Sequence, residues 1–169
     1  MTKKLTRERI IATIKIAHKC GELPDLSELD LSQMNLRGID LRNVNLQGAD
    51  LSHADLSGTD LRGAWLSHAC LYNASLRGAD LRGADMDHAD LVKANLAGAD
   101  LRGATLTDTL LTDANFEGTN LNGATIEHLY PSKTSQFSNS LSNNNSTVTR
   151  LTNFGRPETV ATIETVETR

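Results

Sequence analysis

The stretch that decides the fold is residues 74–101, ASLRGADLRGADMDHADLVKANLAGADL. A large apolar residue occupies every fifth position here, and the same step runs without a gap from Leu26 to Ile126. These 21 central positions hold 18 Leu, and the remaining three hold Met86, Phe116 and Ile126. The residue two places before each central position is Ala in 13 of the 21 units. The sequence is therefore an uninterrupted array of five-residue repeats.

A five-residue period fits neither an α-helix nor a flat β-strand. On a helix, a step of five rotates by about 140° and scatters the leucines around the axis. On a strand, an odd step sends successive leucines to opposite faces. The leucines all point inward only if the chain turns a corner about once per repeat. The period therefore predicts an all-β solenoid with flat sides.

A slower, twenty-residue period gives the number of sides. Three series follow it: Gly58, Gly78, Gly98 and Gly118; Asp40, Asp60, Asp80 and Asp100; and Arg42, Arg62, Arg82 and Arg102. Twenty residues at five per side predict four sides. Residues 24–130 then form about five stacked coils, with a spacing of about 4.8 Å.

The units Ala49-Asp50-Leu51, Ala79-Asp80-Leu81 and Ala94-Asn95-Leu96 resemble the A(D/N)Lxx repeat of the pentapeptide-repeat family. The leucine-centred array is similar to those of many cyanobacterial members. The resemblance implies a right-handed quadrilateral β-helix, a handedness that the spacing does not provide. An interior filled by Leu and Ala leaves no cavity for a substrate or cofactor, and the sequence contains no nucleophile–base–acid constellation. We therefore expect a non-enzymatic protein that needs no cofactor or metal.

Residues 1–23 precede the array and predict a helix that caps its first coil. Ile10, Ile14 and Ala17 form an apolar stripe over residues 7–19, Thr6 is a suitable N-cap and Gly21 can end the helix. The predicted outer face is basic: Arg7, Arg9, Lys15 and Lys19. We interpret it as the solvated face of a docked helix, with membrane or nucleic-acid contact as the alternative.

Residues 131–169 form the third segment. Its first part is so rich in Ser, Asn and Thr that we expect a mostly disordered tail. Residues 129–131 leave the last coil and could fold over it. If they do not cover it, a homodimer through the C-terminal coil would hide the exposed end.

Composition narrows the remaining choices. The net charge of −4 argues against direct nucleic-acid binding. The only two cysteines, Cys20 and Cys70, lie far apart in the sequence, which is typical of a reduced, cytoplasmic protein. No stretch approaches the roughly 20 apolar residues of a membrane span.

The twenty-residue period assigns each outward residue to one of four sides. Side 1 is centred on residues 26, 46, 66, 86, 106 and 126, and side 2 on residues 31, 51, 71, 91 and 111. Side 3 is centred on residues 36, 56, 76, 96 and 116, and side 4 on residues 41, 61, 81, 101 and 121. Side 4 carries the Asp and Arg series, which we expect to pair along and between coils. The alternative is an arginine strip that binds an acidic partner.

The acidity of the array lies on sides 1 and 2, because sides 3 and 4 are neutral. Side 1 carries Asp25, Glu28, Asp85, Asp87, Asp108 and Glu127. Side 2 carries Asp30, Asp50, Asp90 and Asp113 against a single cation, Lys93. The two sides together sum to −9.

Sides 1 and 2 also break the repeat. Outward positions that elsewhere hold Asp, Asn or Ser hold Trp65, Cys70, Tyr72, Val92 and Leu110. Exposed aromatic residues are common anchors of interfaces, although single exposed apolar residues are also ordinary. The candidate partner-binding face is Trp65, His68, Cys70, Tyr72, Asp85, Asp87, His88, Asp90 and Val92. His68 and His88 occupy equivalent positions one coil apart, with Asp108 next along the column, but the spacing does not force a third close metal ligand.

Two functions remain. The first is a protein–protein interaction scaffold that presents this partly acidic, aromatic face to a protein partner. The second follows from the resemblance, since some family members mimic duplex DNA and modulate DNA gyrase or other type II topoisomerases. A four-sided coil has about the width of a duplex, but here the charge is confined to two sides. The central residue is also Leu, whereas Phe predominates in those members.

Overall fold

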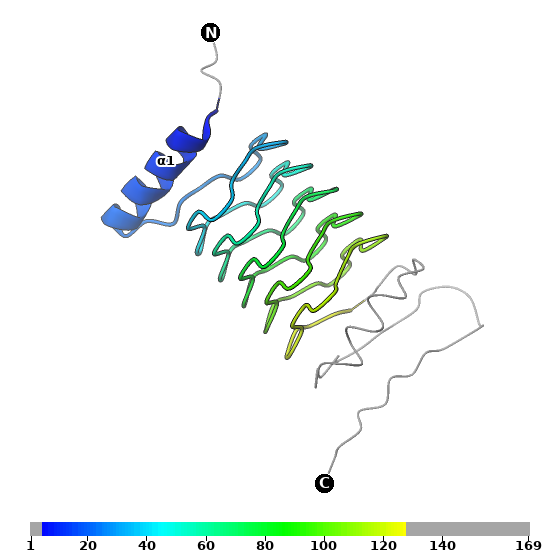
Figure 1. Cartoon of the computed structure of the whole chain (residues 1–169). Helices are drawn as coiled ribbons and strands as arrows, with labels where there is room; N and C mark the ends of the chain where they lie inside the picture. The colour runs from blue at the N-terminus through cyan, green and yellow to red at the C-terminus, as the bar shows by residue number, and fades with distance from the viewer. Residues whose placement is uncertain (1–4, 128–169) are drawn as a thin grey trace, which may run out of the picture.

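The structure, a computed structural model, describes residues 5–127. The chain begins with helix α1 (Arg7–Cys20), and flat coils then stack along one axis with α1 at one end of the stack (Figure 1). The predicted disordered tail and the expected cover of the last coil lie outside the described residues. The C-terminal homodimer therefore stays a prediction. No helix in this described part is long and apolar enough to cross a membrane.

Successive coils are joined by parallel β-bridges between residues that lie twenty positions apart. These bridges run from Asp25–Asn45 to Thr105–Thr125 and involve the residue just before each central position. Backbone hydrogen bonds surround every bridge. At side 1, for example, the N–H of Leu66 donates to the carbonyl of Asp85 at 2.6 Å. The register is the one that the twenty-residue period predicts.

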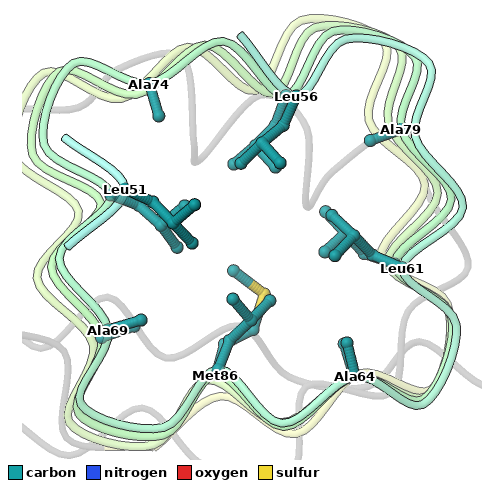
Figure 2. Packing of buried hydrophobic residues seen from close by; sticks show 14 of the residues in the cluster. Leu51, Leu56, Leu61, Ala64, Ala69, Ala74, Ala79 and Met86 are labelled. Atoms are coloured by element: carbon teal, nitrogen blue, oxygen red, sulfur yellow. The ribbon is translucent and has the colours of Figure 1, made fainter. Parts of the chain in front are cut away.

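The interior is filled by the central residues and the alanines. Leu51, Leu56, Leu61 and Met86 point to the centre from four different sides, with the alanines beside them near the corners (Figure 2). Every central residue from Leu26 to Ile126 is at most 4% exposed. At three alanine positions, Thr59, Thr109 and Thr119 are buried, and their hydroxyls donate to backbone carbonyls at 2.6–3.0 Å. The buried polar groups are thus satisfied within the core.

The turn within each repeat explains the preferred outward residues. The residue two places after the centre has a positive φ in every unit from Glu28 to Gly123, as in a type II turn. Glycine adopts this conformation without a steric penalty. The residue before the centre accepts a hydrogen bond from the N–H two residues later, as Asn95 Oδ1 does from Ala97 at 3.1 Å. This bond explains the preference for Asp or Asn.

Helix α1 packs on the first coil and supplies its missing donors. Ile10 and Ile14 are buried in the same apolar cluster as the central leucines. The Arg7 guanidinium donates to the carbonyls of Asn35 at 2.7 Å and Arg37 at 2.8 Å. In later coils the equivalent carbonyls accept N–H groups of the preceding coil, which the first coil lacks. The prediction of Arg7 on a solvated outer face is therefore wrong, because its guanidinium caps the edge of the first coil.

Candidate partner-binding face

The exposed large apolar side chains of the array lie on sides 1 and 2. Within residues 24–127 they are Trp65, which is 42% exposed, and Leu110, which is 41% exposed. Trp65 is also the only tryptophan of the chain. The two residues lie two coils apart, on adjacent sides, each just before a central leucine. An exposed indole on a rigid backbone is a suitable anchor for a partner.

Both residues also break the local rule for the turn. Neither Trp65 nor Leu110 can accept the side-chain hydrogen bond that Asp or Asn accepts at this position, and Cys70 is at best a weak acceptor. Five of the six positions without Asp or Asn lie on sides 1 and 2: Trp65, Cys70, Thr105, Leu110 and Thr125, with Ser75 on side 3. The turns at Trp65, Cys70 and Leu110 thus lack a hydrogen bond that nets about 0.5–1.5 kcal/mol.

The corner residue of each repeat, two places after the central residue, shows a second departure from the regular repeat on sides 1 and 2. Ten residues other than glycine have φ between 54° and 60°: Glu28, Gln33, Asn43, His53, His68, Asn73, His88, Lys93, Asp108 and Asp113. Nine of them lie on sides 1 and 2. Left-handed backbone costs an ordinary residue about 1–2 kcal/mol, and less for Asn or Asp. Strain that gathers in one region is typical of functional sites.

His68 and His88 form a stack at the corner between sides 1 and 2. Their ring centroids lie 4.8 Å apart with an interplanar angle of 4°. The Nδ1 of His88 lies 3.9 Å from Oδ2 of Asp108 in the next coil. Because the rings are parallel, their nitrogen lone pairs do not converge on one point. Among residues 5–127, no group of three or more His, Cys, Asp or Glu could hold a metal ion.

Tyr72 is half-buried, and side chains from the coil before it and the coil after it lie against it. The His53 ring packs against it edge-on, with centroids 5.5 Å apart. Lys93 Nζ lies 3.4 Å from the Tyr72 hydroxyl and 5.7 Å from its ring centroid. Asn73 Nδ2 lies 2.9 Å from His53 Nδ1. The prediction of an exposed Tyr72 is therefore wrong, because His53 and Lys93 lie against its ring, whereas its role in binding a partner stays a prediction.

Cys70, Val92 and the three candidate carboxylates are also half-buried. The carboxylates take part in the turns. Asp85 Oδ1 accepts the N–H of Asp87 at 3.1 Å, and Asp90 Oδ1 accepts that of Val92 at 2.9 Å. Asp87 Oδ1 instead accepts the N–H of Thr107 in the next coil at 2.8 Å. Within residues 5–127, none of the three pairs with an arginine or lysine inside 4.0 Å.

Side 4 shows the opposite arrangement, and the predicted pairing of Asp with Arg is confirmed. Arg82 binds Asp80 through two bonds of 2.8 Å and 2.7 Å, and its Nε lies 3.8 Å from Asp100 in the next coil. The hydrogen bonds from Arg82 hold the pKa of the Asp80 carboxyl below its usual value. The same pairs recur at Asp40, Asp60 and Asp100. The arginines of side 4 are thus engaged with its own carboxylates.

The fold defines a class, the four-sided β-solenoids built from five-residue units. The family profile for pentapeptide repeats matches residues 25–63, 59–98, 69–108 and 89–127, with 8 copies of the repeat. The chain therefore belongs to the pentapeptide-repeat family. Solved members of this family imply a right-handed quadrilateral β-helix.

Solved structures of the family resemble the chain. A pentapeptide repeat protein from the thylakoid lumen of Arabidopsis thaliana is 30% identical, with a TM-score of 0.55, and the match covers 63% of this chain and 71% of that one. A pentapeptide repeat protein from Nostoc PCC 7120 is 30% identical, with a TM-score of 0.47, and the match covers 76% and 91%.

A third structure is QnrB1, a plasmid-mediated fluoroquinolone resistance protein. It is 20% identical with a TM-score of 0.41, and the match covers 64% of this chain and 53% of that one. No curated protein is significantly similar to the chain in sequence.

The site residues that the sequence missed are His53, Asn73 and Lys93. The signal was present, because each stands in a column of side chains at a corner where side 3 has only glycine.

Proposed function

We propose that the chain is a non-enzymatic scaffold for protein–protein interaction, and that sides 1 and 2 bind the partner. The scaffold is a β-helix of about five coils, closed at its N-terminal end by α1. The observation that carries the proposal is the coincidence of three departures on the same two sides. These sides bear the exposed Trp65 and Leu110, the strained corners, and three carboxylates, Asp85, Asp87 and Asp90, that pair with no arginine or lysine among residues 5–127.

Stability alone does not account for this coincidence. Sides 3 and 4 belong to the same coils, yet they keep glycine at all corners but Asn43 and Asp or Asn at all turns but Ser75. The departures on sides 1 and 2 replace residues that suit the turn with residues that do not. A binding role gives a physical reason to retain them, since an aromatic anchor with nearby carboxylates suits a partner surface of mixed apolar and basic character.

The alternative, a DNA-mimicking modulator of gyrase or another type II topoisomerase, fits the charges less well. Duplex DNA carries one charge per about 1.7 Å, or about 15 over the length of this array. The −9 of the array lies on two sides, and the carboxylates of side 4 are bound to arginines. A supercoiling assay separates the two functions. Inhibition of gyrase, or its protection from quinolones, at micromolar protein would favour the alternative.

Affinity capture with the intact chain tests the scaffold proposal. We expect Trp65→Asn to reduce recovery of specific partners at least about tenfold, because a central aromatic anchor contributes about 2 kcal/mol or more. The substitution should not disturb the fold, since Asn45 occupies the equivalent position one coil earlier. Arg102→Ala on side 4 is the matched control and should capture the same partners as the wild type. Unchanged capture by both Trp65→Asn and Tyr72→Ser would overturn the proposal.

A further inference from the structure

We propose that the corner around Tyr72 is an oxyanion-binding site that accepts a carboxylate or phosphate group. The site consists of His53, Tyr72, Asn73 and Lys93, which come from three successive coils of side 2. We call it the Tyr72 corner. Its assignment is independent of the partner proposed above. Only the source of the anion, an acidic or phosphorylated residue of that partner, rests on the proposed function.

The hydrogen bonds inside the Tyr72 corner leave three donor groups without an acceptor inside the corner. The amide nitrogen of Asn73 can only donate, so Nδ1 of His53, 2.9 Å away, accepts. The proton of the neutral imidazole is then on Nε2. The Lys93 ammonium can only donate, so the Tyr72 oxygen, 3.4 Å away, accepts and its O–H remains a donor. The corner therefore offers an imidazole N–H, a phenol O–H and an ammonium.

The charge of Lys93 is available to a ligand. Lys93 is the only cation on sides 1 and 2, and Asp113 occupies the equivalent corner of the next coil. Nevertheless, in the part of the chain that the structure describes, no carboxylate lies within 4.0 Å of its nitrogen. Its contacts are the hydroxyl and the ring face of Tyr72. Charge-assisted bonds of this kind are the strong ones in oxyanion recognition.

The backbone supports the assignment. His53, Asn73 and Lys93 all have φ between 55° and 60°, whereas the equivalent corners of side 3 are glycine in every coil. All three side chains are exposed, so a ligand can reach them. Tyr72 is held between the coil before and the coil after it, which fixes the position of its hydroxyl. The strained backbone thus displays the Lys93 ammonium and the His53 imidazole beside the fixed phenol of Tyr72.

Titration of the full chain with inorganic phosphate, followed in its assigned ¹H–¹⁵N spectrum, tests the proposal. We expect saturable shifts confined to the Tyr72 corner, with an apparent Kd of about 1–10 mM, as suits a small exposed site. Lys93→Gln should raise this Kd about tenfold and Tyr72→Phe by a smaller factor. Glutamine is tolerated at this corner, because Gln33 has a φ of 58° in the same column. Arg77→Gln removes one positive charge from side 3 and should leave the Kd unchanged.

Acetate titration in parallel distinguishes the sources of the anion. Saturation by both ions means that a carboxylate suffices, and saturation by phosphate alone assigns the site to a phosphorylated group. Shifts that do not saturate with either ion, or that are the same in Lys93→Gln, would overturn the proposal. That result would leave the capture test with Trp65→Asn unaffected, so the two proposals fail separately.

Discussion

Sides 3 and 4 have glycine at nine of their ten corners from Gly38 to Gly123, whereas sides 1 and 2 have a side chain at nine of their ten corners. The two halves share the same coils and the same backbone turns, and their central residues are leucine in all but three repeats. They differ mainly in the side chains that point outward from the turns and corners. Sides 3 and 4 mostly use residues that form the turn without backbone strain and with its hydrogen bond. The aspartates and arginines of side 4 also neutralise one another. Sides 1 and 2 accept strained corners and missing hydrogen bonds, and they present aromatic and acidic groups. The core and the regular turns maintain the solenoid, whereas the outward side chains of sides 1 and 2 are available for binding.

The largest expected effect comes from truncating core leucines, and it tests whether sides 1 and 2 are packed as tightly as sides 3 and 4. Leu71 on side 2 and Leu81 on side 4 are both fully buried. We expect Leu71→Ala and Leu81→Ala each to lower the free energy of unfolding by about 2–5 kcal/mol, because each leaves a cavity. Urea unfolding should give values that agree within about 1 kcal/mol. A larger difference would mean that the two halves also differ in their cores.

The corners give a smaller effect of opposite sign on the two halves. Gly83 on side 4 has a φ of 65° and open space where a Cβ would lie, so Gly83→Gln introduces only backbone strain. It should destabilise the protein by about 0.5–1 kcal/mol, because the strain is partly offset by the freedom that the unfolded chain loses with glycine. Gln33→Gly on side 2 should stabilise it by about 0.5–1 kcal/mol, less than the strain because glycine also gains freedom in the unfolded chain. Thermal unfolding measures both, and a destabilising Gln33→Gly would show that the corner of side 2 is not strained.

The side-chain hydrogen bond of the turn can likewise be added on side 2 and removed on side 3. Cys70→Asn should add the missing bond to the N–H of Tyr72 and stabilise the protein by about 0.5–1.5 kcal/mol. Asn95→Ala on side 3 removes the equivalent bond, 3.1 Å long, and should destabilise it by a similar amount. Chemical denaturation of both variants checks the pair. If Cys70→Asn were neutral, the turn on side 2 would have another source of stability.

The smallest effect concerns the charges of side 4. Asp80→Asn keeps the turn bond but loses the pairing with Arg82, so we expect a loss of about 0.5–1 kcal/mol at pH 7. Because the arginine lowers the pKa of Asp80, its stabilisation is present above the ordinary aspartate pKa of 3.8 and is lost as the pH falls below it. The two proteins should therefore become equally stable in acid. Asp90→Asn, which loses no arginine partner, is the control and should change little at pH 7.

The fold could be predicted because a solenoid is periodic. The step of five fixes which residues face inward, and the step of twenty fixes which residues meet between coils. The pairing of Asp80 with Arg82 followed from the same register. Handedness did not follow, because mirror-image coils have the same spacing; it came from the family.

The site was predicted only in part. The sequence showed where the repeat is broken, and Trp65 is exposed as expected. The cover of Tyr72 by His53 and Lys93 depends on side-chain conformations across three coils, which no period encodes. The role of Arg7 depends on carbonyls that only the edge of a stack leaves unpaired. Both features depend on side-chain conformations and on the end of the stack, and neither of the two periods determines these.

One variant tests the central claim, that sides 1 and 2 exchange stability for binding. The variant Trp65→Asn, His68→Gly, Cys70→Asp, Tyr72→Ser makes the middle of these sides regular. Every replacement already occurs in its own column one coil earlier, as Asn45, Gly48, Asp50 and Ser52. Affinity capture with this variant is the decisive measurement, read beside its melting temperature. The account predicts a higher melting temperature and the loss of specific partners. A variant that captures the same partners as the wild type would contradict it.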